Sequence, residues 1–482
     1  MRLFSFLFVC LPGMVTACQV METEDQKESF TPRFEVVAQT EDFPVAVPSS
    51  FDSTLGWLVV QEDRSDAMSN EIKLPVAIIH TDAESPKSPV LYLSGGPGAS
   101  AMRTAAFPGA YPWLKERDFI VIGQRGTHYA KPALMCPEFR TAIENDTDRI
   151  SSVLACKERL ERAGIGLENY NSETSAADLE DLRTAVGIEK WNLYGASYGT
   201  RLALIYAKSF GENLDAMVLD SPLPPNAVYD DQSAINLEQA IRGVAEDCAS
   251  QPACNEAFPD LQRRFFQTIE AVTQSPLEIE GLDDPVTGAD LVSLLPLNFG
   301  SDVRRAPLIM DLLARLDPVV TERLAGAAGA SDFAWGMRFS VWCSEALPFS
   351  ERYRMAEPGP TLGGYESAAI APELCRAWDV GTLDEGIAAP VSSDVPTLIV
   401  AGEFDPLTPP VWAELAAETL SNSLVAIARG DSHSVTQQWG SDGCAMALAA
   451  DFINEPQRVL EAPKSTHCLF NRTAPEYLLK WE

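Results

Sequence analysis

The sequence predicts an α/β fold, in which a mostly parallel β-sheet has helices on both faces and a helical segment is inserted into it. Short apolar runs of strand length alternate with helical patterns as far as about residue 225 and again after residue 386. Strands that alternate with helices form parallel sheets covered on both faces. Residues 226–386 instead show mostly helical periodicity. We therefore expect one sheet, encoded by residues 34–225 and 387–482, and a helical cap at 226–386.

The elements of the sheet region follow in chain order. In the helix expected at residues 175–186, Leu179, Leu182 and Val186 share one face. Two further helices are expected, and one of them follows the strand at 191–194 after a serine flanked by glycines. The predicted strands are 57–60, 74–79, 90–93, 119–122, 191–194, 216–219, 397–400 and 423–428, and the other predicted helices are 201–209 and 411–419.

The N-terminus has the features of an export signal. An apolar run at residues 3–11 follows a minimal charged start and is too short to span a bilayer. The V-T-A-C motif at residues 15–18 resembles the bacterial lipobox, whose cysteine is lipidated and becomes the first residue of the mature protein. We expect a signal peptide at 1–17, lipidation of Cys18, a polar tether at 18–33 and a place in the bacterial cell envelope. The alternative is a plain secretory signal and a soluble secreted protein.

Eight cysteines remain when Cys10 and Cys18 of the signal region are set aside. An even number in an exported chain indicates disulfides. A zinc site is disfavoured because no CxxC pair occurs and the chain has only four histidines. Pairing of nearest neighbours closes loops of modest length and predicts the bonds Cys136–Cys156, Cys248–Cys254, Cys343–Cys375 and Cys444–Cys468.

The charge balance excludes two classes of partner. With 36 basic and 69 acidic residues, the net charge is −33. Nucleic-acid binding needs a cationic surface, and so does docking on anionic lipid. We therefore expect membrane contact through the lipid anchor only. The acidic surface is compatible with a field that attracts cationic substrates.

The sequence G-A-S-Y-G at residues 195–199 matches the G-x-S-x-G pattern of a nucleophilic serine. It lies between a predicted strand and a predicted helix, which is the context that this motif requires. Glycines on both sides allow a sharp turn that exposes the serine oxygen, and the start of the following helix favours negative charge. Ser197 is the predicted nucleophile, and a structural turn is the competing interpretation.

A serine needs a base, and the base needs an acid to orient it. In the fold that carries this motif the chain order is serine, acid, histidine. His433 follows the last predicted strand, whereas His467 lies in the tail beside a cysteine. Asp405 follows the strand at 397–400 and is the predicted acid, with Glu403 and Asp220 as rivals.

The oxyanion of acyl transfer needs two backbone N–H donors. One is expected from Tyr198, the residue after the nucleophile. The other is expected from the S-G-G-P-G segment at 94–98, which follows an upstream strand. Proline has no N–H, so Gly95 or Gly96 must donate. A simple Gly-Pro turn is the alternative interpretation of this segment.

Together these motifs resemble the tripeptidyl aminopeptidase and prolyl iminopeptidase group of α/β-hydrolases. The resemblance runs from about residue 34 to the C-terminus and is carried by residues 94–98, 124–127, 195–200, 401–406 and 430–433. The C-S-E stretch at 343–345 and the tail stapled by Cys444 and Cys468 resemble the tripeptidyl branch more narrowly.

Two motifs depart from the group's usual form. Ser94 stands where the group has histidine, and Gly123 and His128 replace the outer residues of the usual D-Q-R-G-T-G. Both departures lie near the expected site, so they bear on substrate preference more than on the triad. The resemblance implies an α/β-hydrolase fold and a serine exopeptidase that needs neither a metal nor an organic cofactor. It also implies that the helical block is a cap over the entrance.

The expected function is removal of one or a few residues from the free N-terminus of a peptide. An esterase or small-molecule amidase is the main alternative, because the same triad serves any acyl transfer. A catalytically inactive, peptide-binding lipoprotein is disfavoured by the complete Ser-Asp-His set. An aminopeptidase must recognise an ammonium group, for which a carboxylate is the natural partner. Glu345, which ends an aromatic-rich stretch at 333–345, is the candidate, with Asp332 and Asp379 as rivals.

Overall fold

In the computed structural model, residues 32–482 form one compact unit. The predicted signal peptide, Cys18 and most of the predicted tether lie outside the described residues. The structure describes residues 30–37, 43–145, 147–278, 285–295, 299, 302–318, 332–355, 361–365, 370–437, 443–462, 466–471 and 475–480.

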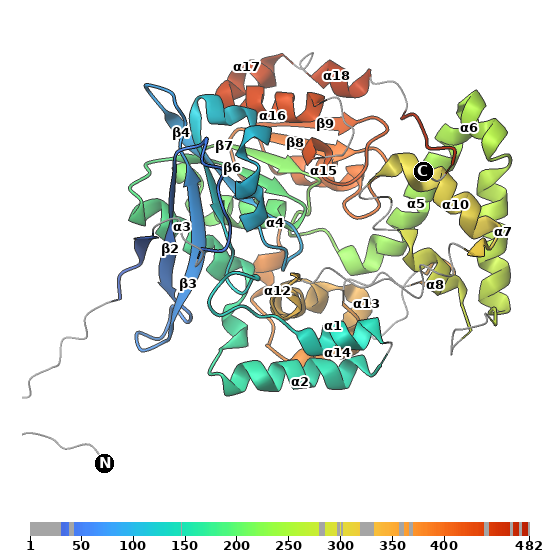
Figure 1. The fold of residues 1–482 in the computed structure, drawn as a ribbon, viewed down its shortest axis with the longest axis horizontal. Helices are drawn as coiled ribbons and strands as arrows, with labels where there is room; N and C mark the ends of the chain where they lie inside the picture. The colour runs from blue at the N-terminus through green and yellow to red at the C-terminus, as the bar shows by residue number, and fades with distance from the viewer. Residues whose placement is uncertain are drawn as a thin grey trace, which may run out of the picture. The chain divides into compact units, whose positions relative to one another are not determined.

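Within the described residues, nine strands form a single sheet in the order β1-β2-β3-β5-β4-β6-β7-β8-β9 (Figure 1). The pairs from β1 to β5 along this order are antiparallel, and all pairs from β5 to β9 are parallel. The strands are β1 (Arg33–Val37), β2 (Ser53–Gln61), β3 (Glu71–Ile79), β4 (Lys87–Leu93), β5 (Arg117–Ile122), β6 (Trp191–Ala196), β7 (Leu214–Asp220), β8 (Thr397–Gly402) and β9 (Ser423–Ala428).

The predicted strands are confirmed, and the structure adds β1. Every residue of β6 and β8 is buried, which explains why these central parallel strands appear in the sequence as short, continuous apolar runs. By contrast β1 is an edge strand with a mostly half-exposed pattern. Its charged Arg33 and Glu35 pair across β2 with Glu71 and Lys73 of β3, so it carries no apolar run to mark it.

All the described helices follow β4 in the chain, either between later strands or after β9. The α-helices are α1 (Pro137–Glu144), α2 (Arg149–Arg162), α3 (Ser172–Ala185), α4 (Tyr198–Phe210), α5 (Tyr229–Ser250), α6 (Pro252–Ala257), α7 (Leu261–Gln274), α8 (Gly288–Ser293), α10 (Ala306–Ala314), α12 (Trp335–Glu345), α13 (Glu351–Met355), α14 (Pro372–Trp378), α15 (Pro410–Ala417), α16 (Cys444–Asn454), α17 (Pro456–Glu461) and α18 (His467–Phe470). The 3₁₀ helices are η1 (Met102–Ala106), η2 (Pro108–Ala110), η3 (Pro112–Lys115), η4 (Leu167–Asn169), η5 (Gly211–Asn213), η6 (Val303–Arg305), η7 (Leu347–Phe349), η8 (Glu385–Ala388) and η9 (Val435–Gln437).

Both faces of the sheet are covered, as a parallel sheet requires. Apolar residues of α3, α4 and α15 pack on one face and form one core cluster with the strands. The other face packs against η1, η3, α16, α17 and α18. These two layers enclose the sheet, and the carboxyl ends of the parallel strands lie at one edge of it.

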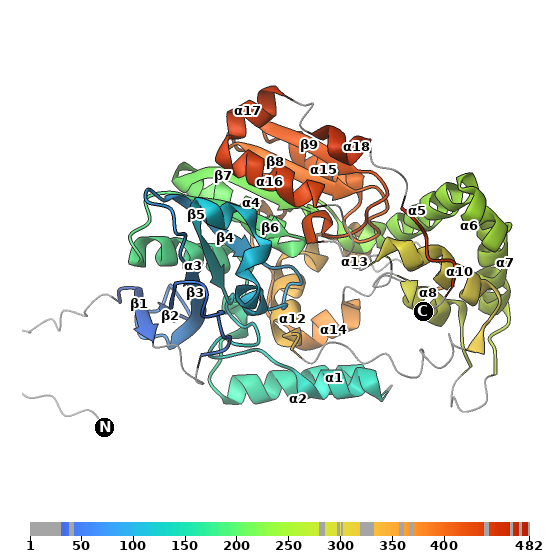
Figure 2. The ribbon, with the colours of Figure 1, turned by 45° about the horizontal axis from the view of Figure 1, so that its top comes forward.

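The helices between β7 and β8 form two clusters rather than one. Helices α5, α6, α7, α8 and α10 share one apolar core. Helices α12 and α14 belong to another, which also includes α1 and α2 from between β5 and β6 (Figure 2). The sequence does not predict helices α1 and α2. They lie in the chain between β5 and β6, within the region that otherwise alternates strand and helix.

Candidate active site

Ser197 lies in the sharp turn between β6 and α4, where its backbone has φ 56° and ψ −124°. Two glycines make room for this turn. A Cβ on Gly199 would lie 2.0 Å from the carbonyl oxygen of Leu93, and a Cβ on Gly195 would lie 2.6 Å from that of Gly199. The N–H of Ser197 donates to the carbonyl oxygen of Asp220 at 2.9 Å. Close packing therefore fixes Ser197 at the carboxyl edge of the sheet.

The glycine loop after β4 lies directly against this serine. A Cβ on Gly95 would lie 3.0 Å from the Cβ of Ser197 and 3.4 Å from its Oγ. Gly96 has φ +115°, which favours glycine, and is joined to Pro97 by a cis bond. Tyr198 is the first residue of α4 and is fully buried. The structure thus brings the predicted donors, Gly95, Gly96 and Tyr198, to the surroundings of the serine.

Ser94, which replaces the histidine usual in the group, closes this loop. Its hydroxyl donates to the carbonyl oxygen of Ala99 at 2.9 Å, and its own carbonyl oxygen accepts from the Gln124 side chain at 3.2 Å. Ser94 and Gln124 are both buried. With serine in place of histidine, this position therefore still carries a polar side chain that holds the loop in place.

His433 and Asp405 form a short polar pair. The distance between His433 Nδ1 and Asp405 Oδ2 is 2.8 Å. The Asp405 carboxylate also accepts from the N–H groups of Leu407 (2.8 Å) and Thr408 (2.9 Å) and from the Thr408 hydroxyl (2.8 Å). Both carboxylate oxygens are therefore fixed. A carboxylate at Nδ1 favours the tautomer in which Nδ1 carries the proton and Nε2 is the basic nitrogen.

Asp220 connects the turn of Ser197 with the loop of His433. Its carbonyl oxygen accepts from the N–H of Ser197. Its carboxylate accepts from the N–H groups of Val435 and Thr436, at 2.9 Å each, and from the Thr436 hydroxyl. Asp220 is fully buried, so these bonds compensate its removal from water. The sequence left it as a rival acid, and the structure instead places it at the joint between the two loops.

The negative charges of Asp405 and Asp220 affect the pKa of His433. Burial disfavours the imidazolium, but Asp405, with a contribution from Asp220, outweighs it, and the pKa of His433 is raised above its ordinary value. Burial raises the pKa of Asp220 against the opposing effect of its hydrogen bonds and of His433. The site therefore stabilises a positive charge on His433.

The other rivals lie in different surroundings. The Glu403 carboxylate accepts from the N–H of Gly430 at 2.8 Å and so holds the turn after β9. His467 lies in the short helix α18. At the end of β8, a Cβ on Gly402 would lie 2.1 Å from the carbonyl oxygen of Ser432. This close approach sets the His433 loop against β8.

Glu345 is not available to a substrate ammonium group, which corrects the expectation for this residue. It is fully buried. One carboxylate oxygen accepts from Arg201 Nε at 3.0 Å and from the Ser172 hydroxyl, and the other accepts from the Ser172 N–H at 2.8 Å. A buried carboxylate must be paired in this way. Residues near Glu345 in the chain do not indicate this pairing, because its cationic partner lies 144 residues earlier.

Two arginines of the site region were not predicted. Arg125 forms a bidentate, fully buried pair with Asp178, with both distances 2.7 Å, which explains the Q-R-G-T motif as part of the scaffold. Arg338 of α12 donates from Nη1 to the carbonyl oxygen of Gly96 at 2.8 Å. Its position as the one cation of an aromatic-rich helix is the signal that could have indicated it.

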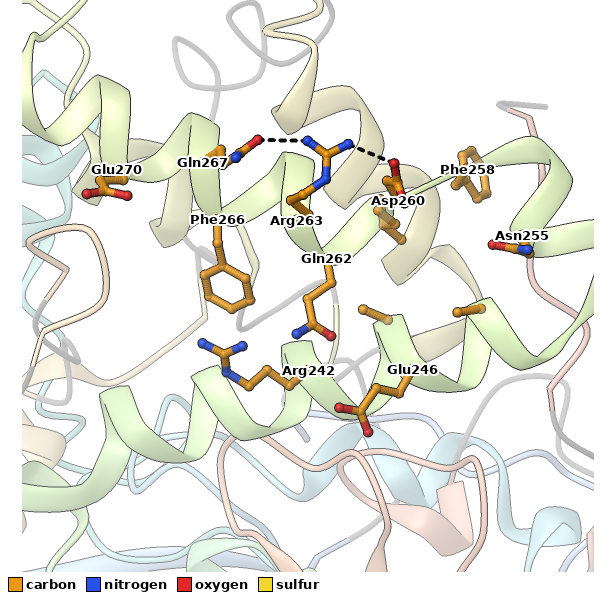
Figure 3. Close-up of a pocket in the computed structure, with 13 residues that line it drawn as sticks. Arg242, Glu246, Asn255, Phe258, Asp260, Gln262, Arg263, Phe266, Gln267 and Glu270 are labelled. Atoms are coloured by element: carbon orange, nitrogen blue, oxygen red, sulfur yellow. Dashed lines mark hydrogen bonds and ion pairs between the residues drawn. The ribbon is translucent and has the colours of Figure 1, made fainter.

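A cavity of about 480 Å³ lies elsewhere, between α5 and the α6–α7 segment (Figure 3). Its two arginines have partners: Arg263 pairs with Asp260, and Arg242 pairs with Glu238 and lies over the Phe266 ring. The residues that line it do not include Ser197, Asp405 or His433.

The structure contains the disulfides Cys136–Cys156, Cys248–Cys254, Cys343–Cys375 and Cys444–Cys468, which are the predicted pairs. Disulfides are typical of exported proteins. In the part of the chain that the structure describes, no cluster of three or more His, Cys, Asp or Glu could hold a metal ion. None of the described helices has the length and apolar character that crossing a membrane requires.

Comparison with known proteins gives two family models that match parts of this chain. Residues 88–277 match the family model described as the alpha/beta hydrolase fold, and residues 364–464 match the model described as TAP-like protein. Serine protease Hip1 of Mycobacterium tuberculosis is 25% identical over 407 residues, which cover 73% of this chain and 75% of that protein.

Other relatives match over shorter stretches. Tripeptidyl aminopeptidase of Streptomyces lividans is 28% identical over 254 residues, 46% of each chain. Proline iminopeptidase of Xylella fastidiosa is 42% identical over 53 residues, which cover 11% of this chain and 17% of that protein. Among solved structures, proline iminopeptidase of Mycobacterium smegmatis aligns with a TM-score of 0.41 and 14% identity, over 84% of this chain and 99% of that one. The chain is an enzyme of the α/β-hydrolase fold and is similar to the group that includes the tripeptidyl aminopeptidases and proline iminopeptidases.

Proposed function

We propose that this protein is an exported serine exopeptidase that cleaves short pieces from the free N-termini of peptides. The observation that carries the proposal is the placement of a strained serine turn and a His433–Asp405 pair at the same edge of the sheet, joined through Asp220. The names of the relatives support a peptide substrate over other acyl compounds.

In the proposed mechanism Ser197 attacks the carbonyl carbon of the scissile bond while His433 accepts its proton. Asp405 orients the imidazole and stabilises its positive charge. The backbone N–H of Tyr198, with that of Gly95 or Gly96, stabilises the oxyanion. His433 then gives its proton to the leaving amine. Water, deprotonated by His433, hydrolyses the acyl-enzyme in the second half of the reaction.

We propose that the helical segment at 226–386 acts as the cap that selects substrates. The helices from α5 to α14 lie between β7 and β8 in the chain and support this view. Export through a lipid anchor on Cys18 is the proposed localisation, and the disulfides support export.

The test is a panel of peptide p-nitroanilides with free and acetylated amino groups, together with p-nitrophenyl esters. We expect rapid cleavage of the free-amino anilides and little of the acetylated ones. Ser197→Ala should lose several orders of magnitude of activity and remain folded. Ser209→Ala, an exposed serine on the same helix, is the matched control and should behave as the native enzyme. Equal cleavage of blocked and free anilides would reject the exopeptidase. A marked preference for esters would favour the esterase or amidase alternative.

A further inference from the structure

The N-terminal end of α12 is fastened to the glycine loop of the proposed oxyanion hole. The N–H of Ala334, just before the helix, donates to the carbonyl oxygen of Gly98 at 3.0 Å. One turn later, Arg338 donates to the carbonyl oxygen of Gly96 at 2.8 Å. A Cβ on Gly98 would lie 2.7 Å from the Ala334 carbonyl oxygen, so the loop and the helix are in direct contact. Two carbonyl groups of the glycine loop thus depend on α12 for their direction.

The C-terminal end of the same helix is fastened to the other half of the hole. Glu345, its last residue, holds Arg201 of α4 through its carboxylate (3.0 Å) and its carbonyl oxygen (2.9 Å). It also holds the N–H and the hydroxyl of Ser172. The Ser172 hydroxyl lies 2.8 Å from the phenol oxygen of Tyr198, whose N–H is the second proposed donor. All these side chains are buried.

The helix itself is held independently of the loops that it contacts. The N–H of Gly336 donates to the carbonyl oxygen of Leu134 at 2.9 Å. Its residue Cys343 is joined to α14 by a disulfide, and Trp378 of α14 donates to the Ser340 hydroxyl at 3.0 Å. Both ribbon views place α12 between the sheet and the α1–α2 pair (Figures 1 and 2).

We propose that α12 is a strut that sets the spacing of the oxyanion hole, with Arg338 and Glu345 as its positioning residues. The inference rests on the proposed function, since it needs the hole at Gly95, Gly96 and Tyr198. Its physical basis is that displacement of catalytic groups by about 1 Å costs about 100-fold in rate. Neither residue touches the reacting atoms, so each acts through the backbone that it holds.

The test measures kcat and KM for a p-nitrophenyl ester, and the inhibition constant of phenylboronic acid. The boronate forms a tetrahedral adduct on a nucleophilic serine and places an oxygen in the hole. The variants are Arg338→Met, Arg338→Lys and Tyr198→Phe. Glu345→Gln is included, but it leaves Arg201 buried without a countercharge and so is expected to destabilise the fold. Tyr198→Phe tests the same end of the helix without leaving a buried charge unpaired. Arg264→Met, which removes an ion pair between α7 and α10, is the matched control.

We expect Arg338→Met and Tyr198→Phe to lower kcat about tenfold or more, with KM nearly unchanged. A displaced donor should lose part of the rate that complete loss of one oxyanion donor would cost. The affinity for phenylboronic acid should fall by the same factor as kcat/KM. Arg338→Lys should recover part of the loss, because lysine can still donate to Gly96. The control should keep native values.

A native kcat in the folded variants would overturn the strut, and so would a lower kcat with full affinity for the boronate. A rise in KM alone would also overturn it, because α12 would then contact the substrate instead. An ester reports on the hole whether or not the enzyme prefers peptides. Failure of the exopeptidase proposal would appear separately in the anilide panel.

Discussion

At the scale of single residues, the site combines a strained backbone with closely packed glycines. A positive φ at a serine costs on the order of 1–3 kcal/mol and persists only where the surroundings enforce it. At Ser197 the enforcing contacts are those of Gly195 and Gly199 with backbone atoms, which cannot move aside as side chains can. The second feature of the site is electrostatic: the negative charge of Asp405 raises the pKa of His433.

The raised pKa of His433 sets the acidic limb of the pH profile. The proposed base works only when neutral, so kcat/KM should rise with pH through a pKa above the ordinary value of 6.5. Asp405→Asn removes the carboxylate that raises this pKa. We expect the limb to move to lower pH and kcat/KM to fall about 10⁴-fold. Glu403→Gln is the control, since it leaves the His433–Asp405 pair intact. A limb that stays in place in Asp405→Asn would exclude Asp405 as the partner.

Gly199 should tolerate no side chain. In Gly199→Ala the new Cβ would lie 2.0 Å from the Leu93 carbonyl oxygen, so α4 must shift away from β4. We expect a free energy of unfolding lower by about 3 kcal/mol or more, together with loss of activity. Gly211→Ala, at the other end of the same helix, meets only Val395 at 3.7 Å and has φ −58°. Thermal unfolding should show it to be as stable as the native protein, and equal destabilisation of both variants would contradict this account.

At the scale of elements, the helices of the inserted segment serve two purposes. Helices α5 to α10 pack mainly on one another. Helix α12 shares its core with α1, α2 and α14, and also with Tyr198 of α4 and Trp412 of α15. By its contacts α12 therefore packs with the elements around the candidate site, although its place in the chain assigns it to the predicted cap. The disulfide to α14 holds its C-terminal half.

The Cys343–Cys375 disulfide should matter for both stability and activity. It closes a separation of 32 residues, and its removal in the double variant C343S/C375S should cost about 2–4 kcal/mol. Because it holds α12, we also expect a lower kcat. The matched control C248S/C254S removes a bond of separation 6 at the α5–α6 junction. It should lose less stability and keep kcat. The measurements are thermal unfolding and ester hydrolysis, and a selective loss of kcat in the control would oppose this assignment.

At the scale of the whole molecule, the net charge of −33 makes the protein strongly acidic, and the four disulfides suggest export to an oxidising compartment. An acidic surface is repelled by anionic lipid, so we do not expect the protein surface to add a second attachment. We therefore propose that the lipid anchor on Cys18 is what attaches the protein to a membrane.

Cys18→Ser should move the protein from the membrane fraction to the soluble fraction. The serine cannot be lipidated through a thioether, and an acidic surface is not attracted to anionic lipid. Cys10→Ser, within the apolar run, is the matched control and should stay with membranes. Fractionation and incorporation of a labelled fatty acid measure the two properties. Persistence of Cys18→Ser in the membrane fraction would reject the lipobox interpretation.

The sequence by itself determined the features that depend on neighbours in the chain. The buried strands appear as apolar runs because both faces of β6 and β8 are covered. Ser197 is recognisable because its turn needs glycines at fixed positions beside it. His433 and Asp405 are recognisable because each follows a strand whose carboxyl end must meet that of β6. The disulfides join nearest cysteines, so spacing was sufficient.

Only the tertiary structure decided what depends on contacts between distant segments. Glu345 was expected to face a substrate, and its partners Arg201 and Ser172 lie 144 and 173 residues away. The link from Arg338 to Gly96 spans 242 residues. Helices α1 and α2 pack in one core with α12 and α14, which follow much later in the chain. Periodicity records which face of an element is buried, but it carries no information about which buried polar groups meet, because that is fixed by how the elements pack.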